Sequence, residues 1–129
     1  MNLLIDTHVL LWWATSSKRL GRQASDLLSE PHNTVWVSAA SIWEISIKIS
    51  LKRLDSRLTS QVPENLESNG FRPLPITIAH ALAVRDLPHH HGDPFDRILI
   101  AQAQCEDLTL LTADAAIQAY DVRTIDAAR

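Results

Sequence analysis

Hydrophobic positions along the chain gather into short runs, and longer stretches of mixed apolar and polar residues separate them. Short apolar runs bounded by turn residues are typical of buried β-strands, and longer mixed stretches are typical of amphipathic helices. The runs predict strands at residues 2–6, 34–37, 71–75, 109–112 and 122–125. The intervening stretches predict helices at residues 7–14, 22–29, 39–54, 62–70, 77–86, 94–105 and 113–119.

The alternation of strands and helices indicates the fold class. Helices supply the crossovers that parallel strands need, so this order predicts an α/β fold with a parallel sheet covered on both faces. Pro73 indicates that the strand at 71–75 lies at a sheet edge, because proline has no backbone N–H to donate.

Residues 39–54 carry two competing patterns. Isoleucine at every second position from 45 to 49 is a strand pattern, yet apolar residues also recur at helical spacing. A strand over the whole segment would exceed the usual length of about 3–10 residues. We therefore predict a helix, with Ser38 or Ser41 as its N-cap.

Length and composition favour one compact domain over residues 1–129, since 46% of the residues are hydrophobic. The single cysteine, Cys105, excludes an internal disulfide and is predicted to pack as a small apolar side chain, which fits a reducing cytoplasm. Asp6 argues against a signal peptide, and no apolar run approaches the roughly 20 residues that span a bilayer. We expect a cytoplasmic protein with no membrane partner.

The formal net charge of -3 is not typical of nucleic-acid-binding proteins, which are usually basic. The positive charges nevertheless form two clusters, and each can contact phosphates or simply lie on a solvated helix face. One cluster is Lys18, Arg19 and Arg22, and the other is Lys48, Lys52, Arg53 and Arg57.

Four acidic residues follow predicted strands closely or lie in the first turns of a helix. Sites in parallel α/β sheets form where the carboxyl ends of strands meet, and carboxylates gathered there would repel one another unless a divalent cation held them. Each acid alone also has a structural interpretation, such as a helix cap, so the convergence of all four is the stronger signal. The predicted metal ligands and catalytic residues are Asp6, Glu44, Asp96 and Asp114.

Mg²⁺ and Mn²⁺ prefer oxygen ligands, and either cation can activate water and offset charge on a phosphate. Other polar residues near the four acids can orient carboxylates or waters, or can only cap helices. These are Thr7, Ser38, Thr112 and Asp93, of which Asp93 is also the predicted N-cap before Pro94. The histidines at 89–91 can bind metal or phosphate, but adjacent loop histidines are usually solvated.

Other enzymes and binding proteins built around aspartates or phosphates fit poorly. A haloacid-dehalogenase-like phosphatase needs an aspartate where His8 stands, and a response-regulator receiver needs a lysine later than Lys52. Three glycines do not supply a P-loop or a dinucleotide-binding loop. Metal-dependent phosphodiester cleavage remains.

The chain resembles the PIN-domain family, specifically the VapC-type ribonuclease toxins of type II toxin–antitoxin systems, over nearly its whole length. The matching motifs are LLIDTHVLLWW, VSAASIWEISIK, HGDPFDRILIAQA and LTLLTAD, which contain Asp6, Glu44, Asp96 and Asp114 respectively. The resemblance implies a three-layer α/β/α fold with about five parallel strands and Mg²⁺- or Mn²⁺-dependent endoribonuclease activity. It also implies a homodimer, a cognate VapB-type antitoxin and an RNA substrate. On this interpretation Asp93 either supports the metal ligands without binding the metal or is an alternative ligand.

Two other functions stay open at this point. A non-catalytic RNA- or protein-binding module can keep the same fold, and the modest net charge leaves room for it. A deoxyribonuclease can use the same acidic residues. Dependence of cleavage on a metal separates an enzyme from a binding module, and parallel RNA and DNA substrates separate the two nucleases.

Overall fold

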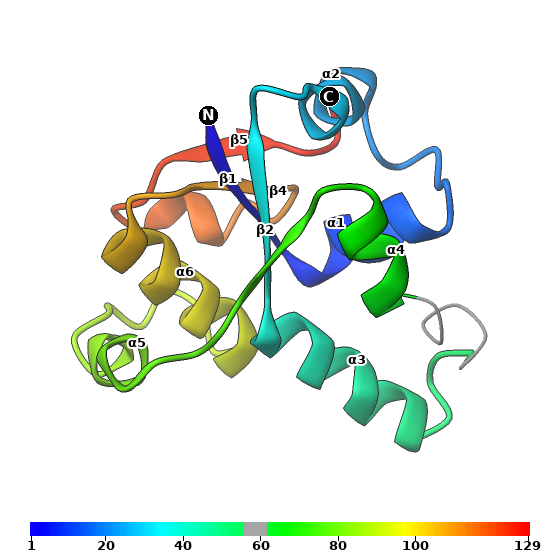
Figure 1. Ribbon diagram of the computed structural model, residues 1–129. Helices are drawn as coiled ribbons and strands as arrows, with labels where there is room; N and C mark the ends of the chain where they lie inside the picture. Colours follow the sequence, from blue (N-terminus) through cyan, green and yellow to red (C-terminus); the bar gives the residue numbers. More distant parts are fainter. Residues whose placement is uncertain (56–61) are drawn as a thin grey trace.

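The structure is a computed structural model that describes residues 1–55 and 62–129, without the side chains of residues 63–65. These residues form a twisted sheet with helices around it (Figure 1). The strands are β1 (Asn2–Ile5), β2 (Thr34–Ser38), β3 (Arg72–Leu74), β4 (Thr109–Thr112) and β5 (Thr124–Asp126). The helices are α1 (Thr7–Ala14), α2 (Arg22–Ser29), α3 (Ala39–Ser50), α4 (Val62–Ser68), α5 (Ile78–Val84) and α6 (Pro94–Glu106).

The sheet has the order β3-β2-β1-β4-β5, and every neighbouring pair is parallel. The predicted α/β class with a five-stranded parallel sheet is thus confirmed for the described part of the chain. β3, which contains Pro73, lies at an edge as the missing N–H requires.

Two apolar cores occupy the two faces of the sheet, because successive residues of a strand point in opposite directions. Leu3 and Ile5 pack on one face with side chains from α1, α2 and α4. Leu4, between them, packs on the other face with side chains from α6. The sheet is therefore the middle of three layers, which confirms the predicted α/β/α architecture (Figure 1).

α3 settles the ambiguous segment in favour of the helix. Ser38 is its N-cap, and the Ser38 hydroxyl accepts a 3.0 Å hydrogen bond from the N–H of Ala40. The helix ends at Ser50, earlier than the predicted limit of residue 54. Arg57, the last member of the second basic cluster, lies outside the described residues.

Two sequence predictions are wrong. Residues 113–119 do not form an α-helix; they contain a 3₁₀ turn at Ile117–Ala119. The N–H groups there bond to carbonyls three residues earlier, as from Ile117 to Asp114 at 3.2 Å. Cys105 is exposed instead of packed, because it lies in the last turn of α6, where the buried residues of that helix have ended at Ala103.

α5 packs on α6 through a polar residue and exposes apolar ones. His80 is buried, and its Nε2 lies 2.8 Å from Oε1 of Glu106 on α6. Ile78 and Leu82 on the same helix are 80% and 54% exposed. Among the described residues, no helix combines the length and apolar character that a membrane crossing requires.

Candidate metal centre at the carboxyl edge of the sheet

Asp6 lies directly after the central strand β1, at the carboxyl edge of the sheet. It is the N-cap of α1: Oδ1 accepts a 2.8 Å hydrogen bond from the N–H of Val9. Oδ2 accepts a 2.5 Å hydrogen bond from the hydroxyl of Thr112 at the end of β4. Burial raises the pKa of Asp6 above its usual range, although both hydrogen bonds oppose the rise.

Asp93 and Asp96 occupy the start of α6, where the sequence predicted an aspartate cap followed by proline. Asp93 is that N-cap, since its Oδ1 accepts hydrogen bonds from the N–H groups of Phe95 at 2.8 Å and Asp96 at 3.3 Å. Asp96 lies in the first turn and is buried. Burial, and then the negative charges of Asp93 and Asp6, raise the pKa of Asp96 to about 6.

Asp114 reaches the same place from the turn after β4. Its Oδ1 accepts a 2.9 Å hydrogen bond from the N–H of Ala116, so it caps the turn, and its Oδ2 faces the site. Its own N–H donates to the hydroxyl of Thr112 at 3.1 Å. Thr112 therefore touches two of the predicted ligands, as a residue that orients carboxylates would.

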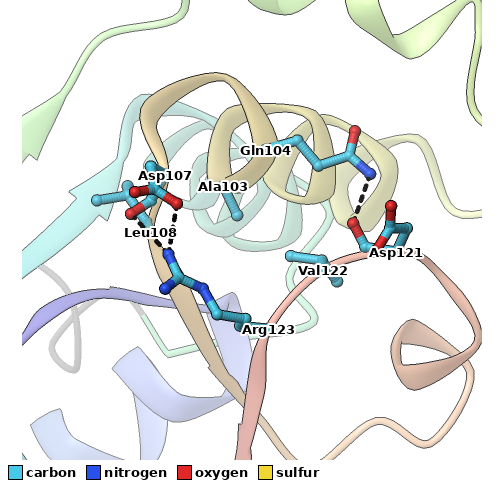
Figure 2. A pocket seen from close by; sticks show the side chains of 7 residues that line it. All are labelled: Ala103, Gln104, Asp107, Leu108, Asp121, Val122 and Arg123. Atoms are coloured by element: carbon cyan, nitrogen blue, oxygen red, sulfur yellow. Dashed lines mark hydrogen bonds and ion pairs between the residues drawn. The ribbon is translucent and has the colours of Figure 1, made fainter.

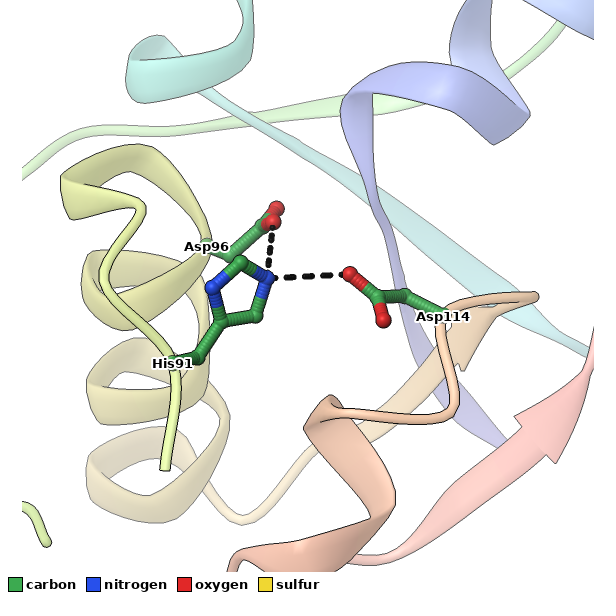
Figure 3. A group of neighbouring side chains, drawn as sticks. All are labelled: His91, Asp96 and Asp114. Carbon is green, nitrogen blue, oxygen red and sulfur yellow. Dashed lines mark hydrogen bonds and ion pairs between the residues drawn. The ribbon is translucent and has the colours of Figure 1, made fainter. Parts of the chain in front are cut away.

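His91 is the site residue that sequence reasoning underestimated. Its Nε2 lies 3.0 Å from Oδ2 of Asp96 and 3.0 Å from Oδ2 of Asp114, between the two carboxylates (Figure 3). The neighbouring His89 and His90 are exposed, as expected of loop histidines. The available signal was position: His91 stands two residues before the N-cap of the acidic helix.

The charges around His91 decide its ionisation. Partial burial by itself lowers the pKa of the imidazole, but the hydrogen bond to Asp114 and the charges of Asp96, Asp114 and Asp93 outweigh it. The net result is a pKa raised above the ordinary value for histidine.

Glu44 is buried on α3, and its carboxylate pairs with Lys48, with Nζ 3.0 Å from Oε2. The pair joins successive turns of one helix. Glu44 is not in the group of mutually close ligand atoms that the described residues form, which consists of His91, Asp96 and Asp114. Asp6 is not in that group either, but it shares Thr112 with Asp114 and its charge acts on Asp96.

Thr7 and Ser38 make structural contacts. Thr7 donates a 3.1 Å hydrogen bond to the hydroxyl of Ser41 on α3, and Ser38 caps α3. Thr7 thus joins α1 to α3, and Ser38 joins the end of β2 to α3. Thr112 is the one of the three predicted hydroxyl residues that bonds directly to a predicted ligand.

The carboxylates fit a divalent cation. Asp96 and Asp114 each offer an oxygen, and these atoms and Nε2 of His91 all lie within 4.8 Å of one another. The charge of Asp6 also raises the pKa of Asp96, so a third carboxylate acts on the same group. Crowded carboxylates with raised pKa values are stabilised by a nearby positive charge, and their oxygens suit Mg²⁺ or Mn²⁺.

A separate hollow of about 540 Å³ lies at the other end of α6 (Figure 2). Asp107 and Arg123 pair across it, and Gln104 donates to the carbonyl of Asp121 at 3.0 Å. None of the predicted ligands lines it. The hollow is therefore separate from the candidate metal centre at the carboxyl edge of the sheet.

Comparison with known proteins gives relatives that match nearly the whole chain. Ribonuclease VapC22 of Mycobacterium tuberculosis is 28% identical over 123 residues, which cover 92% of this chain and 91% of that protein. The structure of VapBC2 from Rickettsia felis, bound to a DNA fragment from their promoter, aligns with a TM-score of 0.76 and 14% identity over 97% of this chain and 98% of that one. FitAcB from Neisseria gonorrhoeae aligns with a TM-score of 0.62 and 23% identity over 96% of each chain.

The structural likenesses are below 25% identity, so they support the fold and not the chemistry. The sequence comparison with protein families goes further, because the family model of the PIN domain matches residues 3–123. With that match over nearly its whole length, the chain belongs to the PIN-domain family.

Proposed function

We propose that this protein is a metal-dependent endoribonuclease and the toxin of a VapBC-type toxin–antitoxin pair. The observation that carries the proposal is the close approach of Asp96 and Asp114 at the carboxyl edge of the sheet, where the charge of the buried Asp6 also acts on Asp96. The 28% identical relative named as a ribonuclease supports the choice of RNA as substrate. Hydrolysis of RNA phosphodiester bonds is the reaction that these groups suit best.

The residues proposed to hold Mg²⁺ or Mn²⁺ are the four acids predicted from the sequence: Asp6, Glu44, Asp96 and Asp114. A divalent cation there would supply an activated water and offset the charge that builds on the scissile phosphate. Thr112 would keep Asp6 oriented through its hydroxyl, and the turn after β4 would keep Asp114 in place through the N–H of Ala116.

Lys48 connects the site with the second basic cluster. It pairs with Glu44, while Lys52 and Arg53 follow in the exposed turn after α3. Ammonium and guanidinium groups bind phosphate backbones without reading sequence, so we propose that this part of the cluster contacts RNA beside the acidic site.

We propose a cytoplasmic location, a VapB-type antitoxin and a homodimer. The antitoxin is supported by similarity to the chains of VapBC complexes, whose alignments cover nearly all of this chain. Exposed apolar side chains such as Trp43, Ile78 and Leu82 supply surface for protein contacts. Sedimentation of the purified protein, alone and with the product of an adjacent small reading frame, tests both partners.

The deciding experiment is cleavage of total cellular RNA by purified, antitoxin-free protein. Reactions with Mg²⁺ or Mn²⁺ are compared with EDTA and with the Asp6→Asn variant, and DNA is tested in parallel. Discrete RNA products that need both the cation and Asp6 support the proposal. Binding of RNA without turnover under any cation would favour the non-catalytic module instead, and cleavage of DNA alone would favour a deoxyribonuclease.

A further inference from the structure

The ring of His91 enters the candidate metal centre, and its hydrogen bonds determine what it does there. An imidazole nitrogen beside two carboxylates acts either as a lone-pair ligand for a cation or as an N–H donor to the carboxylates. Nε2 is 3.0 Å from an oxygen of Asp96 and 3.0 Å from an oxygen of Asp114, which suits both roles (Figure 3). The other ring nitrogen distinguishes them.

Nδ1 of His91 accepts a 3.1 Å hydrogen bond from the backbone N–H of Asp93. A backbone N–H only donates, so Nδ1 must carry a lone pair, and the proton of the neutral ring is on Nε2. Histidines that bind metals through Nε2 usually have the opposite arrangement, in which Nδ1–H donates to a carbonyl or carboxylate. His91 is therefore arranged as an Nε2–H donor to Asp96 and Asp114.

Buried groups fix the backbone of His91, so the ring position is not that of a free surface loop. Its N–H donates to the hydroxyl of Tyr120 at 2.8 Å. Nη1 of Arg97 donates to that same hydroxyl at 3.1 Å and to the carbonyl of His91 at 3.4 Å. Arg97 also donates to the carbonyls of Val84, Leu87 and Pro88, which anchors the approach to the loop.

The oxygens that His91 contacts are those that a cation would need. Oδ1 of Asp114 already accepts from the N–H of Ala116, so Oδ2 is the oxygen that faces the site. The imidazole contacts this Oδ2 and the Oδ2 of Asp96. A cation that binds both oxygens at once therefore competes for them with the Nε2–H group.

We propose that His91 is a positioning residue, not a metal ligand: its Nε2–H holds Asp96 and Asp114 together in the metal-free site, and a divalent cation displaces it. The displacement step rests on the proposed function, since it requires that these two carboxylates bind the cation. The donor role of Nε2 stands on the hydrogen bonds alone. The two parts can therefore be tested separately.

The donor role is tested on the metal-free wild-type protein by long-range ¹H–¹⁵N correlation spectra of its histidines. At a pH above the raised pKa of the imidazole, where the ring is neutral, the inference expects a protonated Nε2 and an unprotonated Nδ1 for His91, with assignment from the spectrum of His91→Gln. The reversed pattern would overturn it. This measurement needs neither cation nor RNA, so it is independent of nuclease activity.

Displacement is tested by titrating Mn²⁺ and measuring the free ion by electron paramagnetic resonance. Removal of a competing donor predicts that His91→Ala binds Mn²⁺ roughly tenfold more tightly than wild type, or about 1.4 kcal/mol. His89→Ala, on the same loop and exposed, is the matched control and should bind as wild type does. Spin-echo spectra of wild type with Mn²⁺ should lack the ¹⁴N coupling of a directly bound imidazole.

Equal or weaker Mn²⁺ binding by folded His91→Ala, or a directly bound ¹⁴N in wild type, would overturn the displacement. Metal-dependent RNA cleavage by the wild-type protein would be unaffected by either result, so the proposed function would stand. No Mn²⁺ binding by the wild-type protein would overturn both the displacement and the proposed Mn²⁺ chemistry of the nuclease. The failures of the two proposals are thus distinguishable.

Discussion

The hydroxyl of Thr112 donates a hydrogen bond to Oδ2 of Asp6, so the ends of β4 and β1 are joined although the residues are 106 positions apart. The same hydroxyl accepts the N–H of Asp114. One threonine thus sets the positions of two proposed ligands. Its bond to Asp6 also lowers the pKa of that carboxyl, against the larger effect of burial.

Replacement of Thr112 by valine is expected to weaken Mn²⁺ binding and RNA cleavage about 10- to 100-fold, as is usual when the partner of a ligand is removed. Valine keeps the shape but cannot hold Asp6 or accept the N–H of Asp114. Thr112→Ser keeps the hydroxyl and should stay close to wild type. Wild-type Mn²⁺ affinity in Thr112→Val, measured by titration, would show that the hydroxyl does not matter for the site.

Asp6→Asn should reduce cleavage to the level of the EDTA control while the protein stays folded. Asparagine can still accept the N–H of Val9, so the cap of α1 survives. Burial disfavours the charged form of Asp6. Loss of this charge in Asp6→Asn should therefore lower the free energy of unfolding by no more than about 1 kcal/mol. Asp86→Asn, at an exposed aspartate after α5, is the control for loss of one carboxylate.

Equal cleavage by Asp6→Asn and wild type, with folding checked by circular dichroism, would remove Asp6 from the proposed ligand set. A loss of folding would instead assign it a structural role as the cap of α1.

Arg97 is a buried cation that several backbone carbonyls satisfy. Arg97→Met should lower the free energy of unfolding by on the order of 3 kcal/mol, because those carbonyls lose their donor inside the protein. Tyr120→Phe, which removes one hydroxyl from the same network, should cost about 1 kcal/mol. Urea denaturation of the three proteins measures both, and equal losses would contradict the central place given to Arg97.

The strands could be predicted from the sequence because their apolar runs are buried on both faces of the sheet. Leu3, Leu4 and Ile5 are fully buried although they point in alternate directions, which is why the run is continuous. The acids at the strand ends followed from the same reasoning, since parallel strands bring their carboxyl ends to one edge.

The 3₁₀ turn and the position of His91 could not be predicted, because they depend on side-chain contacts that no local sequence pattern reveals. The turn after Asp114 is 3₁₀ and not α-helical where the Asp114 side chain bonds the N–H of Ala116. His91 reaches the site because Tyr120, distant from it in sequence, and Arg97, on the helix that follows it, hold its backbone. Such side-chain contacts become visible only in the folded chain.

The pKa of Asp96, raised to about 6 from 3.8, predicts a pH-dependent stability in the metal-free protein. Between these values the folded chain binds more protons than the unfolded chain, so the contribution of Asp96 to the free energy of unfolding falls as pH rises. The loss of stability from ionising Asp96 is complete above the folded-state pKa. Asparagine at this position carries no charge and should not cause this loss.

Metal-free Asp96→Asn is therefore expected to exceed wild type in stability at pH 7 by on the order of 2 kcal/mol, and to match it near pH 4. The sign holds with His91 present, because the value near 6 already includes its opposing charge. Denaturation in EDTA from pH 4 to 7.5 measures the difference, and a difference independent of pH would contradict the assignment. Added Mg²⁺ or Mn²⁺ should reduce the difference in stability at pH 7. A bound cation stabilises the wild-type protein more, because the variant lacks the carboxylate of Asp96.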